Sequence, residues 1–333
     1  MSAARPLAHL RVLDLGTPGG HMAVRMLASL GAQCSRLAPE GEDADAIWYR
    51  DVAPVDAPAG SAAFEALLDE TDILLRGPAD NAPDYRSGRP RLIEVVLGPF
   101  MPGGARQDRP ATNLTLMARS GLMEIVGDPD RPPLDLPGEQ AWALGGIQAA
   151  IGAMTALHHR GLTGEGQRVD VSALQSTVLA NYREPLSWAW LGKVGTRTGN
   201  LLVRGATGVR QVWPARDGFV TWALVDNPPM MRAMVKVMGD QARALAEVDW
   251  DATLVADAPA EMIAMWEAEV AAFFAGKDRA DLFELSTTQA LGLSPIDEVP
   301  DVLASAHLAA RGLWDEVDGL RLPGQLWVTG ADT

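Results

Sequence analysis

The stretch LRVLDLGTPGGHMAVRMLASLGAQCSRLAP, residues 10–39, decides the fold class of this chain. Three of the four residues at 12–15 are apolar, which predicts a short strand, and a glycine-rich turn at 16–20 follows. The apolar residues between 22 and 30 then repeat at helical spacing, and a second strand comes after them. The turn does not fit the pattern GxGxxG, so we interpret it as a tight strand-to-helix turn. Strand, turn, helix and strand in this order predict an open α/β fold.

The same alternation continues along the chain. Residues 61–77 predict a helix that leads into a strand, residues 91–100 predict a further strand, and residues 139–160 predict a long helix rich in Ala and Gly. The segment 164–181, GEGQRVDVSALQSTVLAN, predicts a strand followed by a helix whose first turn carries Gln175. Residues 208–227 predict a β-hairpin that turns at Asp217-Gly218, and helices are expected over 229–292.

Composition limits the classes of function. The chain has 333 residues, of which 47% are hydrophobic, and this length suits two domains or one domain with a large excursion. A net charge of −15 argues against nucleic acid or an anionic membrane as a partner. The sequence shows neither a membrane span nor a secretory signal, so a cytoplasmic location is expected. The single cysteine, Cys34, and five histidines without ligand spacing predict no metal site.

Five segments in order carry a resemblance to a known family. The chain resembles the class III CoA-transferases, a family that also includes α-methylacyl-CoA racemases and carnitine-type CoA transferases. The resemblance runs from about residue 10 to residue 328, and its landmarks are RVLDLGTPGGHMAVRMLASLGA, DRPATNLTLMARSGLMEIVGDPDRPPLDLPG, IGAMTALHHRGLTGEGQRVDVSALQ, GNLL with VWPARDGFVTWALVDN, and ALGLSPIDEVPDVLASAHLAARGLW.

This resemblance implies an architecture. We expect an open Rossmann-like α/β large domain formed by 1–190 and 295–333, and a smaller α+β domain formed by 191–294. The family also implies an interlocked dimer in which the active site lies between the large domain of one chain and the small domain of the other. The dimer is expected to be a homodimer or a heterodimer with a family homologue.

The catalytic position of the family differs here. Transferases of this type resemble VDVSxxDA, in which an aspartate is acylated by the donor thioester to form a covalent anhydride. The matching residue is Gln175, whose amide can hydrogen-bond a thioester but is a poor nucleophile. The resemblance therefore implies that the fold is kept while the covalent route through this position is lost.

Racemases of the family use an imidazole and a carboxylate on opposite sides of the α-carbon. The histidine position matches Thr112, the carboxylate position matches Glu139, and a supporting acidic residue matches Asp226. The helix dipole would favour the Glu139 anion at the start of its helix, although a glutamate there is also ordinary capping chemistry.

The resemblance also implies a CoA thioester as substrate. Family members carry arginines at NRGK and RPG motifs, and here Arg50 stands for the first arginine while Arg76 is out of register with the second. Gly98, Thr112 and Asn113 complete the candidate CoA-binding set. Fewer cations in a chain of net charge −15 should weaken the binding of the CoA phosphates.

Three hypotheses for function remain open from the sequence. The chain is an acyl-CoA enzyme that uses Glu139 and Asp226 for proton chemistry of the isomerase, racemase or dehydratase kind, or a CoA transferase that uses another carboxylate. The third hypothesis is a non-catalytic subunit paired with a homologue that retains the aspartate. Four tryptophans are expected to form either an acyl pocket or part of the core: Trp188, Trp190, Trp213 and Trp222.

Overall fold

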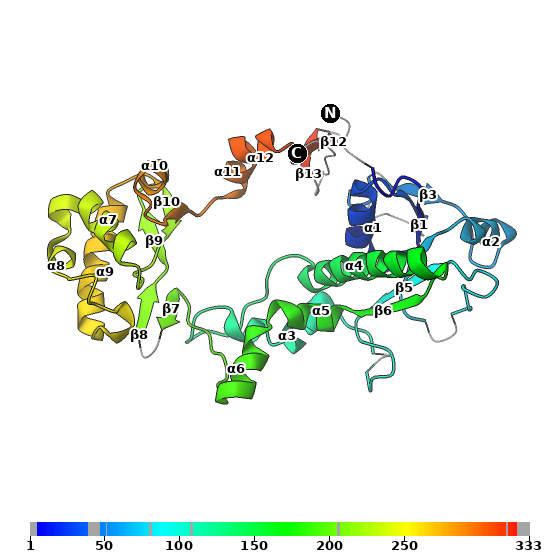
Figure 1. The fold of residues 1–333 in the computed structure, drawn as a ribbon, viewed down its shortest axis with the longest axis horizontal. Helices are drawn as coiled ribbons and strands as arrows, with labels where there is room; N and C mark the ends of the chain where they lie inside the picture. The colour runs from blue at the N-terminus through cyan, green and yellow to red at the C-terminus, as the bar shows by residue number, and fades with distance from the viewer. Residues whose placement is uncertain are drawn as a thin grey trace. The chain divides into compact units, whose positions relative to one another are not determined.

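The computed structural model describes residues 5–38, 47–50, 52–79, 82–106, 109–204, 207–317 and 319–324. The chain divides into two compact units (Figure 1). The first unit consists of 1–126, 133–196 and 311–333, and the second of 127–132 and 197–310. Each unit has its own hydrophobic core.

A six-stranded parallel sheet forms the centre of the first unit. The strands lie in the order β3-β2-β1-β4-β5-β6, so the direction of winding reverses between β1 and β4. Their bounds are β1 (Arg11–Asp14), β2 (Gln33–Leu37), β3 (Ala53–Val55), β4 (Ile73–Arg76), β5 (Ile93–Gly98) and β6 (Arg168–Ser172). The α/β class with a parallel central sheet, predicted from 10–39 and the alternation that follows, is confirmed.

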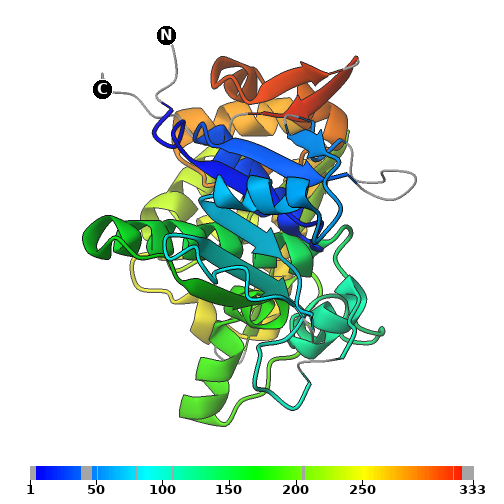
Figure 2. The same cartoon turned by 90° about the vertical axis from the view of Figure 1, so that its right-hand side faces the viewer.

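Helices cover the two faces of this sheet unequally. The helices α1 (Gly20–Ser29) and α4 (Gln140–Thr163) pack on one face, and α2 (Ala62–Asp69) packs on the other (Figures 1 and 2). The remaining elements of the unit are α3 (Asn113–Arg119), the 3-10 turn η1 (Met123–Ile125), α5 (Ala173–Ala180), α6 (Arg183–Leu191), β12 (Trp314–Val317) and β13 (Leu320–Pro323).

The small residues predicted on α4 allow close packing. A Cβ atom on Gly146 would lie 2.4 Å from the carbonyl oxygen of Gly19, and one on Gly152 would lie 2.8 Å from Cγ1 of Val169. Neither position has room for a side chain. The glycines therefore let α4 approach both the turn after β1 and the strand β6, which places the first turn of α4 beside the ends of the strands.

The second unit is built on short antiparallel strands. Its sheets are formed by β7 (Leu201–Arg204) with β8 (Thr207–Arg210), and by β9 (Val212–Ala215), β10 (Gly218–Thr221) and β11 (Ser294–Pro295). The predicted hairpin is present, but its turn lies at 216–217, one residue earlier than expected. The helical elements are α7 (Pro228–Met238), η2 (Gly239–Gln241), α8 (Arg243–Ala246), η3 (Val255–Asp257), α9 (Ala260–Ala275), α10 (Arg279–Gln289), α11 (Val299–Ala304) and α12 (Ala306–Ala310).

The four tryptophans divide between core and surface. Trp213 and Trp222 are buried in the core of the second unit, where each ring packs edge-on against Phe274. Trp188 and Trp190 are exposed on α6 of the first unit. The core interpretation is therefore confirmed for Trp213 and Trp222. Among the helices that the structure describes, none combines the length and the apolar character that crossing a membrane requires.

Candidate functional site

The carboxyl ends of four neighbouring strands meet at one edge of the sheet. The strands β1, β4, β5 and β6 are parallel and end at Asp14, Arg76, Gly98 and Ser172. In open parallel sheets, ligands bind outside the carboxyl ends of the strands, near the point where the strand order reverses. This edge is therefore the candidate functional site of the first unit.

A buried carboxylate holds the turn after β1. Oδ1 of Asp14 accepts hydrogen bonds from the backbone N–H groups of Gly16 at 3.0 Å and Thr17 at 3.3 Å, and its Oδ2 accepts one from the Tyr49 hydroxyl. Burial raises the pKa of Asp14 above its ordinary value of 3.8, although these hydrogen bonds and the charge of Arg36 oppose the rise. Asp14 was not predicted as a site residue. Its signal in the sequence is an acidic residue at the end of an apolar strand.

Gln175 lies in the first turn of α5, as predicted. Ser172 caps this helix by accepting a hydrogen bond from the Gln175 backbone N–H at 3.3 Å, and the Ser172 hydroxyl donates to the carbonyl oxygen of Pro99. The Gln175 side chain is exposed and makes no hydrogen bond within the described residues. It lines a hollow of about 630 Å³ whose wall is mostly apolar, with Ile151 and Leu179 among the lining residues. The amide is thus available to a ligand.

Glu139 occupies the N-cap position of α4, but its side chain forms no capping hydrogen bond. Asn113 supplies that bond instead, because its Oδ1 accepts from the backbone N–H of Ala141 at 2.8 Å. The Asn113 Nδ2 donates to the carbonyl oxygen of Gly138 at 3.1 Å. The capping role considered for the Glu139 carboxylate is therefore wrong, and within the described residues that carboxylate has no hydrogen-bond or ion-pair partner.

Two further candidates for CoA binding have structural roles. Thr112 caps α3 by accepting a hydrogen bond from the Thr115 backbone N–H at 3.3 Å. Gly98 ends β5 where a Cβ atom would lie 3.1 Å from Cγ of Pro78 and 3.4 Å from the carbonyl oxygen of Phe100. A side chain at position 98 would have to displace these neighbours by a few tenths of an ångström, so glycine favours the close approach of the loops. Neither observation tests whether CoA binds to these residues.

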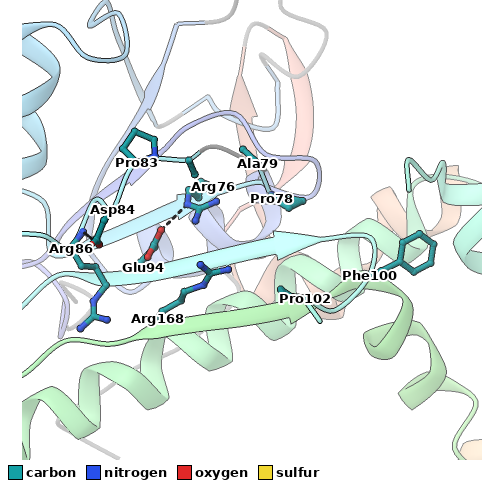
Figure 3. Close-up of a pocket in the computed structure, with 11 residues that line it drawn as sticks. Arg76, Pro78, Ala79, Pro83, Asp84, Arg86, Glu94, Phe100, Pro102 and Arg168 are labelled. Atoms are coloured by element: carbon teal, nitrogen blue, oxygen red, sulfur yellow. Dashed lines mark hydrogen bonds and ion pairs between the residues drawn. The ribbon is translucent and has the colours of Figure 1, made fainter. Parts of the chain in front are cut away.

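Both candidate arginines are held by neighbouring residues. Arg50 is nearly buried, forms an ion pair with Asp315 at 3.2 Å and donates to the carbonyl oxygen of Pro323 at 2.7 Å. Arg76 is also buried, and its Nε donates to Oε1 of Glu94 at 2.7 Å (Figure 3). These contacts occupy part of each guanidinium and leave the prediction of CoA binding untested.

A hollow of about 460 Å³ opens at the carboxyl edge itself. Its lining comes from the turn after β1, the residues after β4 and β5, the segment before α3, and Trp142 of α4. The cation in this lining is Arg109, which sequence reasoning missed. Arg109 lies in the segment DRPATN, within one of the family landmarks and just before α3, and this position could have identified it.

Asp226 belongs to the second unit, whereas Glu139 and Gln175 belong to the first. Its Oδ1 accepts a hydrogen bond from the backbone N–H of Val255 at 2.6 Å, which fixes the start of η3. Asp226 itself is exposed and precedes Asn227, the N-cap of α7. This carboxylate therefore has a structural partner within its own unit.

Comparison with known proteins identifies the family. A model described as CoA-transferase family III matches residues 55–331. The chain belongs to this family. Succinate–glutarate CoA-transferase of Agrobacterium fabrum is 27% identical over 361 residues, which cover 96% of this chain and 88% of that protein. Subunit BbsE of succinyl-CoA:(R)-benzylsuccinate CoA-transferase of Thauera aromatica is 23% identical, with coverage of 92% and 82%.

Solved structures agree with the fold. A CAIB/BAIF family protein from Brucella suis superimposes with a TM-score of 0.77 at 22% identity, covering 98% of this chain and 93% of the other. The predicted membership of CoA-transferase family III is thus confirmed. The replacement of an aspartate by Gln175 and the roles of the individual site residues stay predictions. Within the described part of the chain, no cluster of three or more His, Cys, Asp or Glu residues is arranged to hold a metal ion.

Proposed function

We propose that this chain binds CoA thioesters and transfers CoA between carboxylic acids, with Glu139 as the carboxylate that receives the acyl group. Its membership of CoA-transferase family III supports this proposal, as do the names of the two relatives, both of which are CoA-transferases. No relative described above is named as an isomerase or racemase, so transfer is favoured over the proton chemistry considered from the sequence.

The observation that carries the proposal is the state of Glu139. Its carboxylate lies at the start of α4 with no hydrogen-bond or ion-pair partner in the described residues, because Asn113 makes the capping bond. The helices α3, α4 and α5 share a core cluster that includes Ala141 and Ala173. Glu139 and Gln175 each lie two positions along the chain from one of these two residues. A carboxylate without a hydrogen-bond or ion-pair partner is suited to nucleophilic attack on a thioester.

The chemistry balances in two exchanges. A Glu139 oxygen attacks the thioester carbonyl, the carbon–sulfur bond breaks, and CoA leaves as a thiolate while an acyl anhydride forms on Glu139. The thiolate then attacks the Glu139 carbonyl, which releases the first acid and leaves a glutamyl thioester. The acceptor carboxylate then attacks the glutamyl thioester, and CoA leaves again as a thiolate. The thiolate attacks the acyl carbon that comes from the acceptor, which forms the new CoA thioester and releases the Glu139 carboxylate. The Gln175 amide N–H would donate a hydrogen bond to the thioester carbonyl oxygen.

The CoA moiety is assigned to the carboxyl edge of the sheet. The hollow of about 460 Å³ lies there, and Arg109 in its lining can pair with a phosphate. Arg50, Arg76, Gly98, Thr112 and Asn113 remain the candidate contacts predicted from the family. Asp226 remains the predicted supporting acid, and an interlocked homodimer or a heterodimer with a family homologue remains the predicted assembly.

A second candidate function is that of a subunit without its own acyl transfer. The relative from Thauera aromatica is named as a subunit, and a relative from Chloroflexus aurantiacus is named as the beta subunit of succinyl-CoA–L-malate CoA-transferase. Under this alternative a homologous partner supplies the acylated carboxylate, and this chain completes the shared site.

Acyl trapping tests the proposal. The purified chain is incubated with succinyl-CoA, and intact mass spectrometry with peptide mapping locates any adduct that hydroxylamine removes. We expect an adduct on Glu139 that is absent from Glu139→Gln and present in Glu165→Gln, an exposed glutamate of the same unit. An undiminished adduct in Glu139→Gln contradicts the assignment. Transfer activity that appears only when a homologous subunit is added supports the second candidate.

A further inference from the structure

On one face of the sheet, no helix of the described residues covers β5 and β6 (Figure 3). Parallel strands are joined by crossovers that usually contain a helix, and such sheets are usually covered on both faces. Here β4 and β5 are joined by 77–92, in which none of the described residues is helical. Loops cover this part of the sheet instead, and beneath them lies a hollow of about 480 Å³ (Figure 3).

Charged side chains from three adjacent strands line this hollow. Glu94 pairs in register with Arg168 of the next strand, and Arg76 comes from the strand on the other side. Arg76 forms an ion pair with Glu94 at 2.7 Å, and Arg168 forms one with Asp170 at 2.8 Å. Each of these two guanidinium groups therefore already has a carboxylate partner.

Arg86 differs from the other two arginines in the lining. Its Nη2 donates to the carbonyl oxygen of Gly166 at 2.9 Å, which is a neutral acceptor. Its Nε is buried and has no hydrogen-bond partner, and no carboxylate in the described residues forms an ion pair with it. A buried donor without an acceptor costs free energy. The Nε of Arg86 is such a donor, and the guanidinium has no carboxylate counter-charge within the described residues.

We propose that this hollow binds a small molecule through an oxyanion, a carboxylate or a phosphate, and that Arg86 is its main ligand. Of the three guanidinium groups in the lining, Arg76 and Arg168 are paired with Glu94 and Asp170, so Arg86 is the one that has no carboxylate partner within the described residues. The planar fork of a guanidinium matches the two oxygens of a carboxylate or phosphate. The volume is that of a small-molecule site.

The lining of this hollow shares no residue with the hollow that contains Gln175. It shares Pro78 and Ala79 with the hollow assigned to CoA, so Arg86, which lines only the hollow of about 480 Å³, is the residue that distinguishes the two. The hollow lies on the sheet face that carries Glu94 and Arg168, whereas Val169 and Val171 of the same strand contribute to the core beneath α4. The inference therefore rests on the sheet face that no described helix covers and on the buried Nε of Arg86, which has no hydrogen-bond partner.

Titration calorimetry tests the inference with two probes, inorganic phosphate and succinate, each at constant ionic strength so that general screening is the same. We expect saturable binding of at least one probe, and which of them binds distinguishes phosphate from carboxylate recognition. Arg86→Gln should weaken that binding at least about tenfold, because a charge-assisted pair is lost. Arg183→Gln, an exposed arginine on α6, should leave it unchanged.

Two results would overturn the inference. The first is that neither probe binds the native chain saturably below about 10 mM, which is already a weak affinity. The second is that Arg86→Gln binds the probe as tightly as the native chain does. Circular dichroism establishes that the variant is folded. If it is not folded, Pro102→Glu provides the test, because Pro102 is an exposed lining residue where a carboxylate would compete for the arginines. Undiminished binding in that variant also rejects the site.

Discussion

The side-chain oxygen of Asn113 accepts a hydrogen bond from the backbone N–H of Ala141 at 2.8 Å, across 28 positions of sequence. The same amide donates to the carbonyl oxygen of Gly138 at 3.1 Å. One buried side chain thus joins the start of α3 to the start of α4. Because Asn113 satisfies this N–H group, the Glu139 carboxylate at the N-cap is left without a structural partner and remains available for chemistry.

Asn113→Ala should lower the free energy of unfolding by about 2–3 kcal/mol, because it removes two hydrogen bonds and leaves buried polar groups unsatisfied. Thr112→Ala is the matched control, since it removes an exposed helix cap and should cost about 1 kcal/mol. Urea denaturation of both variants measures the difference. Equal losses in the two variants would show that the Asn113 bond does not fix α4.

The elements of the fold follow from the sequence more readily than the contacts of the site. Apolar spacing located β1, α1 and α4, and the cap of α5 lies where the strand-to-helix pattern ended. The bond from Asn113 to Ala141 depends on how two helices dock, which no local pattern encodes. The pairing of Arg76 with Glu94 likewise depends on the register between β4 and β5, so an arginine expected to bind CoA proved to lie in a buried ion pair.

Asp14 should make stability depend on pH. Burial raises its pKa in the folded state above the ordinary value of 3.8, so the folded state holds this proton more tightly than the unfolded state. Its contribution to stability is therefore largest below pH 3.8 and is lost as pH rises through the raised pKa. The difference in unfolding free energy between the native chain and Asp14→Asn, measured from about pH 3 upward, should fall over that window. A difference that rises with pH would mean that the hydrogen bonds outweigh burial.

Asp226 allows its structural and catalytic roles to be separated. Asp226→Asn keeps an oxygen that can accept from the Val255 N–H, so its stability should stay within about 0.5 kcal/mol of the native chain. Asp226→Ala removes the acceptor and should cost about 1–2 kcal/mol. If Asp226 is the supporting acid, turnover with succinyl-CoA should fall in both variants. Full turnover in a stable Asp226→Asn would remove the residue from the site.

Gln175→Asp should restore acyl transfer at the position where the family resemblance places an aspartate. The exchange is expected to preserve α5, because Ser172 caps the helix through the backbone N–H of residue 175 and the side chain at 175 is exposed. A carboxylate in the first turn of a helix is also favoured by the helix dipole. The variant is best made in the Glu139→Gln background, so that only the new carboxylate can be acylated at the site.

Intact mass spectrometry after incubation with succinyl-CoA should then detect an adduct on the aspartate that replaces Gln175, and hydroxylamine should remove this adduct. Glu139→Gln with Gln175→Asn is the control, because it shortens the side chain without adding a nucleophile. An adduct in the Asp variant alone would locate the thioester carbonyl beside residue 175. If calorimetry shows that succinyl-CoA binds but no adduct forms, the thioester lies elsewhere and Gln175 does not occupy the nucleophile position. The hollow that Gln175 lines would then take no part in the reaction.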